Sequence, residues 1–84
     1  MTSYPGYNNN VVVEGKSYHI QTLVSGEPPR IITAVFEGGA VVVRGEVPLS
    51  EISPEEIISQ IRRQHLRWVE MVRHHEVEKT KDEA

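Results

Sequence analysis

The chain contains four histidines, the side chains that most readily bind a metal or move a proton near neutral pH. His74 and His75 are adjacent, so on a helix their side chains point about 100° apart and cannot chelate as an i, i+4 pair would. His65 has no histidine or carboxylate three or four positions away, so we interpret it as a buried histidine held by one hydrogen bond. An alternative pairs it with His19 across an interface between sheet and helix. No third ligand stands at a suitable spacing, and we predict no metal and no cofactor.

Polar residues on the predicted strands form a second candidate site. A small polar or anionic molecule could be bound by His19, Gln21, Thr22, Thr33 and His65. The chain would then be a ligand-sensing or accessory domain. The same strand residues could equally form the solvated face of an antiparallel sheet.

A group of arginines near the C-terminus suggests an anion-binding or phosphate-binding surface. The group consists of Arg62, Arg63, Arg67 and Arg73, with Glu70 among them. They spread over more than half of a helix circumference, and the formal net charge of the chain is -3. A solvated helix face therefore explains them better, and nucleic acid ranks behind a protein as the expected partner.

No combination of residues indicates catalysis. Ser17, Ser25 and Ser59 have no base and orienting group at a readable spacing. Gly38-Gly39 lies between two strands and lacks the lysine and helix start of a phosphate-binding loop. The sequence therefore leans against an enzyme.

Composition places the chain among ordinary globular proteins. Its 84 residues allow one small domain, with 38% hydrophobic and 25% charged residues. The absence of cysteine excludes disulfides, thiolate zinc sites and cysteine nucleophiles. No apolar run approaches the 18 or so residues of a membrane span, and the first ten residues do not resemble a signal peptide. We expect a cytoplasmic protein that does not bind membranes.

Two hairpins and one helix are predicted to position these side chains. Residues 1–10 are typical of a flexible arm, and β-branched residues then begin a hairpin that turns at Glu14-Gly15. A second hairpin covers residues 31–47 and turns at Gly38-Gly39, which places Phe36 opposite Val41.

A capping serine, Ser53, precedes Pro54 and two glutamates, which predicts a helix from Pro54 to about His75. Its apolar stripe contains Ile57, Ile58, Ile61, His65, Trp68, Val69 and Val72. The domain therefore covers residues 11–75, and residues 76–84 form a polar, disordered tail.

The expected fold class is α+β, a four-stranded antiparallel sheet from two successive hairpins (ββββα) packed on one C-terminal amphipathic helix. We choose as the core face of the second hairpin Ile32, Ala34, Phe36, Val41 and Val43. An apolar patch is then left on the other face by Val12, Leu23, Ile31, Val35 and Val42. Contiguous exposed apolar patches often mark partner sites.

Part of the chain resembles a group of short bacterial proteins that have no established activity. Residues 15–22 read GKSYHIQT and residues 36–39 read FEGG, close to the pattern G-x-x-Y-H-V-Q-T followed by F-x-G-G. The group has a C-terminal helix with a Gln-His pair, which here would be Gln64-His65. Leu23 stands where the group has glutamate. The resemblance singles out His19, Gln21, Thr22 and His65 as positions to test.

The leading hypothesis is a small non-enzymatic protein-interaction module that forms a homo-oligomer, most simply a homodimer, through the apolar sheet face. The alternative is the small-ligand-sensing domain that uses His19, Gln21 and Thr22, with nucleic-acid binding through the helix arginines behind it. Burial of a second sheet face would add to the small net stability of a domain of this size.

Overall fold

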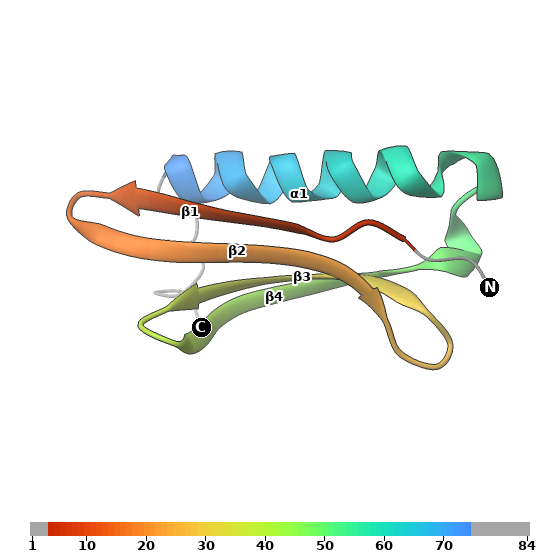
Figure 1. Cartoon of the computed structure of the whole chain (residues 1–84), viewed down its shortest axis with the longest axis horizontal. Coiled ribbons are helices and arrows are strands. Elements are labelled where there is room, and N and C mark those ends of the chain that lie inside the picture. Colours follow the sequence, from red (N-terminus) through yellow and green to blue (C-terminus); the bar gives the residue numbers. More distant parts are fainter. Residues whose placement is uncertain (1–3, 75–84) are drawn as a thin grey trace.

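The computed structural model describes residues 4–74, which form one sheet and one long helix (Figure 1). The elements are β1 (Tyr7–Val13), β2 (Lys16–Ser25), β3 (Arg30–Glu37), β4 (Ala40–Pro48), the short 3-10 turns Leu49–Glu51 and Pro54–Glu56, and α1 (Ile57–Arg73). The strands pair antiparallel in the order β1-β2-β3-β4. The predicted ββββα architecture is confirmed.

Tight turns make the two hairpins possible. Glu14 and Gly15 have φ angles of 50° and 81°, and Gly38 and Gly39 have φ angles of 59° and 85°. Two consecutive positive φ values are typical of a turn whose twist matches that of the flanking strands. β1 begins at Tyr7, so residues 7–10 belong to the sheet and the predicted flexible arm was drawn too long.

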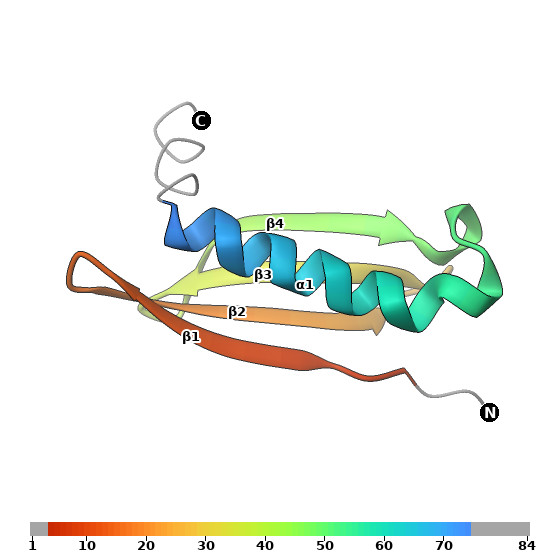
Figure 2. The same cartoon turned by 90° about the horizontal axis from the view of Figure 1, so that it is seen from above.

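The helix α1 covers one face of the sheet, and no element among residues 4–74 covers the other (Figure 1). α1 packs mainly on β1 and β2 and less on β3. From above, β4 runs along the side of α1 for most of its length (Figure 2). The axis of α1 therefore lies closer to β1 and β2 than to β4.

The core lies between α1 and the sheet, but on the face of β3 opposite to the predicted one. Ile31 and Val35 have no exposed surface, whereas Ile32, Ala34 and Phe36 are half-buried on the outward face. The register with β2 explains this choice, because Val35 pairs with Ile20, which is also fully buried. Paired residues share a face, so a core at Ile20 commits β3 to the same side.

A β-bulge changes the register of the second hairpin. Phe36 pairs with Val41 as predicted, but Val35 pairs with Val43 rather than Val42. From there on β4 is shifted by one residue, which brings Gly45 opposite Thr33 on the face toward α1. One extra residue in a strand moves every later side chain to the other face.

The helix departs from the prediction in two respects. Ser53 makes no side-chain capping hydrogen bond, and the first turn is a 3-10 turn, so α1 itself starts at Ile57. Ile58, predicted to be buried, is 57% exposed, and Gln64 is buried instead. The predicted end at His75 and the predicted tail lie outside the described residues.

Candidate functional site

A chain of polar side chains crosses the core between α1 and the sheet. His65 is 2% exposed, with its Nδ1 2.8 Å from Thr22 Oγ1 and its Nε2 2.6 Å from Asn9 Oδ1. Thr22 Oγ1 lies 2.9 Å from Thr33 Oγ1, which accepts a hydrogen bond from Gln64 Nε2 at 3.0 Å. The network therefore runs from the helix through β3 and β2, back to the helix, and out to β1.

With a neutral imidazole at His65, the donors and acceptors of this network follow one order. Gln64 donates to Thr33, so the Thr33 hydroxyl is free to donate to Thr22, whose hydroxyl then donates to His65 Nδ1. His65 Nε2 carries the proton and donates to the Asn9 carbonyl oxygen. This order requires a neutral imidazole, and burial, with a smaller effect from the charge of His19, lowers the pKa of His65.

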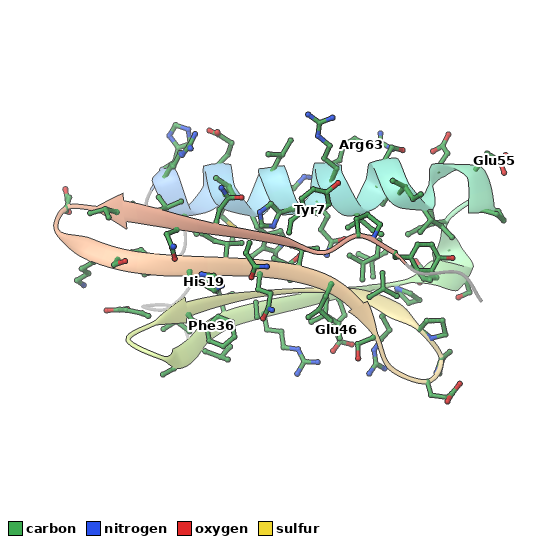
Figure 3. All side chains as sticks on the ribbon, viewed as in Figure 1. Tyr7, His19, Phe36, Glu46, Glu55 and Arg63 are labelled. Atoms are coloured by element: carbon green, nitrogen blue, oxygen red, sulfur yellow. The ribbon has the colours of Figure 1, made fainter. Side chains whose placement is uncertain are left out.

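His65 is enclosed by an aromatic ring and by two hydrogen-bond partners. The Tyr7 ring stacks on the imidazole with the ring centroids 5.5 Å apart, and Figure 3 shows Tyr7 between β1 and α1. Both imidazole nitrogens have partners, rather than the one that the sequence suggested. Thr22, Thr33 and His65 thus bind one another and connect the helix to the sheet.

The other predicted ligand-binding residues lie on the opposite face. His19 and Phe36 point away from α1, with their ring centroids 6.1 Å apart (Figure 3). The two nitrogens of His19 lie 2.9 Å from Asn10 Oδ1 and 3.0 Å from Asn8 Oδ1. Gln21 shares this face by strand alternation. The sheet thus separates His19 and Gln21 from Thr22, Thr33 and His65, and the His19–His65 pairing considered above is not formed.

The outward face also carries an apolar row, which differs from the predicted patch. Its members are Val12, Leu23, Ile32, Ala34, Phe36 and Val41. Val12 and Val41 are 69% and 53% exposed. Three predicted patch members do not belong to it: Ile31 and Val35 are fully buried under α1, and half-buried Val42 packs against the core. The cause is the choice of the wrong face for β3, together with the bulge.

A cleft of about 240 Å³ lies between α1 and β4. It is lined by Gly45, Glu46 and Val47 from β4 and by Gln60, Arg63, Gln64, Arg67 and Trp68 from α1. A Cβ atom on Gly45 would come within 2.5 Å of Trp68 Cζ2, so only glycine lets the indole approach β4 this closely. An isolated glycine in a strand often marks such an approach, and this signal could have located the cleft.

Two of the helix arginines are engaged in ion pairs. Arg63 lies 3.8 Å from Glu56, and Arg73 lies 3.2 Å from Glu70. These pairs are exposed and stabilise the fold little. Nucleic-acid binding by the arginines stays a prediction.

Residues 4–74 contain no group of three histidine or acidic side chains that could hold a metal ion. In the same part of the chain, no helix has the length and apolarity to cross a membrane. Comparison with known protein families, with curated proteins and with solved structures finds no match. The features that bear on function are therefore the two faces of the sheet and the cleft.

Proposed function

We propose that the chain is a small non-enzymatic interaction module that self-associates through the outward face of its sheet. The observation that carries this proposal is the apolar row on that face, centred on Ile32, Ala34 and Phe36 of β3. Nothing among residues 4–74 covers it (Figure 1). A row of apolar side chains along a central strand gains stability when water is removed from it.

The charges at the border of this face are compatible with a second copy of the chain. Two sheets pack face to face at about 10 Å when their side chains interdigitate. The border of the row at β4 carries both signs of charge, because Glu46 pairs with Arg44 at 2.6 Å and with Arg30 at 3.3 Å. A two-fold arrangement therefore brings together borders of mixed charge rather than two fields of one sign.

The available area predicts a weak dimer. Strands spaced about 4.8 Å apart and about 25 Å long give an outward face of roughly 500 Å² for this four-stranded sheet. Two such faces bury roughly 1,000 Å², which is close to the lower limit for a specific interface. We therefore expect self-association that depends on concentration.

The buried network supports a non-enzymatic role. Both nitrogens of His65 are bound by Thr22 and Asn9, so neither is presented to a substrate. The network also joins β1, β2, β3 and α1, and a hydrogen-bonded core of this kind favours one packing arrangement. Its contribution is to hold the helix in place on the sheet.

The test is a charge placed in the apolar row. Phe36→Lys should weaken self-association at least tenfold, measured by sedimentation equilibrium, because the ammonium group loses water in the interface. Ile58→Lys is the matched control, since Ile58 is an exposed apolar residue on α1, away from the outward face. Circular dichroism checks that both variants fold. The proposal fails if Phe36→Lys associates as the wild type does, or if the wild type stays monomeric up to about 1 mM.

A further inference from the structure

Gln64, one of the residues that line the cleft between α1 and β4, has a buried hydrogen-bond acceptor without a donor. Gln64 is 7% exposed, and its Oε1 has no hydrogen-bond partner among the described residues. The amide orientation is set by its nitrogen, which faces Thr33 Oγ1 at 3.0 Å and the Ile31 carbonyl oxygen at 3.5 Å. A flipped amide would place its carbonyl oxygen against the Ile31 carbonyl oxygen, and it would need the proton that the Thr33 hydroxyl donates to Thr22. A buried unpaired acceptor is costly, and a ligand with an N–H group would satisfy it.

The charge of the cleft favours an anion. Arg67 lines it and makes no ion pair or hydrogen bond within residues 4–74. Arg63 also lines it, although its guanidinium lies 3.8 Å from Glu56. Glu46 is the carboxylate among the lining residues, and its charge is offset by the ion pairs with Arg30 and Arg44. A ligand carboxylate or phosphate would therefore meet a net positive charge beside Arg67.

The shape of the cleft favours a small flat group. Trp68 forms one wall, and Gly45 lets this ring lie directly over β4. The volume of about 240 Å³ is below that of sites for drug-sized molecules, which is roughly 300–1,000 Å³. Flat rings stack well on indole, and most of the other lining residues are polar or charged.

We infer that this cleft binds a small aromatic or heteroaromatic anion, with a ring N–H donating to Gln64 Oε1, the flat ring against Trp68 and the anionic group at Arg67. The site lies on the helix side of the sheet, so it is independent of self-association through the outward face. Gln64 also belongs to the buried network, which keeps its nitrogen occupied and leaves its oxygen for the ligand.

The experiment uses indole-3-acetate as the probe, because it combines a flat ring, an N–H donor and a carboxylate. Trp68 is the only tryptophan, so its indole N–H gives a single assignable NMR signal. The probe should move this signal in a saturable way, which gives its dissociation constant. This constant should be at least tenfold higher for Arg67→Gln than for the wild type. The control Arg62→Gln removes an exposed arginine of the same helix that is not among the lining residues, and it should bind as the wild type does.

The role of the Gln64 oxygen is tested by changing the probe rather than the residue, because Gln64 variants would disturb the core. 1-Naphthaleneacetate keeps the ring and the carboxylate but lacks the N–H, and it should bind about tenfold more weakly. The inference is overturned if the Trp68 signal does not move at about 10 mM indole-3-acetate. Equal binding of both probes, or unchanged binding by Arg67→Gln, would overturn it as well.

Discussion

The two faces of the sheet are built from similar side chains but differ in what covers them. On the face under α1, Ile31 and Val35 are fully buried, and the hydroxyls of Thr22 and Thr33 are hydrogen-bonded. On the outward face, Ile32, Ala34 and Phe36 remain half-buried beside polar side chains such as His19. Strand alternation alone does not decide which face becomes the core, because β3 is apolar on both sides.

The covered face is joined to α1 by polar contacts as well as apolar ones. The ordered network of Gln64, Thr33, Thr22, His65 and Asn9 forms only if α1 lies on this face. The outward face has local polar pairs and an uncovered apolar row. It therefore tolerates substitutions that the covered face does not, unless a second copy of the chain packs on it.

The largest difference is expected between two neighbouring isoleucines of β3. Ile31→Ala removes a fully buried side chain and should lower the free energy of unfolding by about 3 kcal/mol. Ile32→Ala, on the outward face, should lower it by about 1 kcal/mol at most. Urea unfolding at low protein concentration measures both in the monomer. Equal effects, or a larger effect for Ile32, would reverse the assignment of the faces.

A smaller loss is expected when the network is interrupted at Thr22. Thr22→Val keeps the shape of the side chain but leaves His65 Nδ1 without its donor and Thr33 without its acceptor. The free energy of unfolding should fall by about 2 kcal/mol, because the abandoned groups stay buried. Thr22→Ser retains the hydroxyl, so it should lower the free energy of unfolding by less than Thr22→Val. If valine is as stable as threonine, the hydrogen-bond order assigned to the network is wrong.

The smallest effect is a pH dependence that belongs to His65. Its pKa is lowered in the folded state from the ordinary value of 6.5, so the unfolded chain takes up a proton first. The stabilisation by neutral His65 is complete above pH 6.5 and is lost as the pH falls through that value toward the folded-state pKa. This loss is at most about 1.4 kcal/mol per pH unit.

Two measurements check this dependence. NMR titration of the imidazole carbons should show His65 charging at lower pH than an unstructured histidine. Urea unfolding between about pH 7 and pH 5 should show a smaller slope with pH in His65→Gln than in the wild type. A His65 that titrates at or above the ordinary value would contradict the neutral imidazole of the network.

Much of the fold could be predicted because its signals are local. The Gly38-Gly39 turn, the Glu14-Gly15 turn and the period of α1 each depend on residues close in sequence. The core face of β3 and the bulge at Val35 depend on pairing with other strands, which short-range patterns do not reveal. Asn9 in the predicted arm was missed because polar residues are poor strand formers, yet it pairs with Ile20 and binds His65.

The candidate site was predictable only in part. Thr22, Thr33 and His65 were proposed together, and the structure does bring them together, although as a bonded network rather than an open pocket. Gln64 was noticed only through the resemblance, because one glutamine on a helix carries no pattern of its own. Its role depends on Thr33 across the core and on the space beside Gly45, both of which require the tertiary structure.

The most direct test of the central claim is a dilution series of the wild-type protein followed by two-dimensional ¹H–¹⁵N NMR. The account predicts that signals of outward residues on the sheet, with Ile32, Ala34 and Phe36 foremost, move as the protein is concentrated, while those of α1 stay in place. Movement confined to α1 and the cleft, or no movement at any concentration, would contradict it.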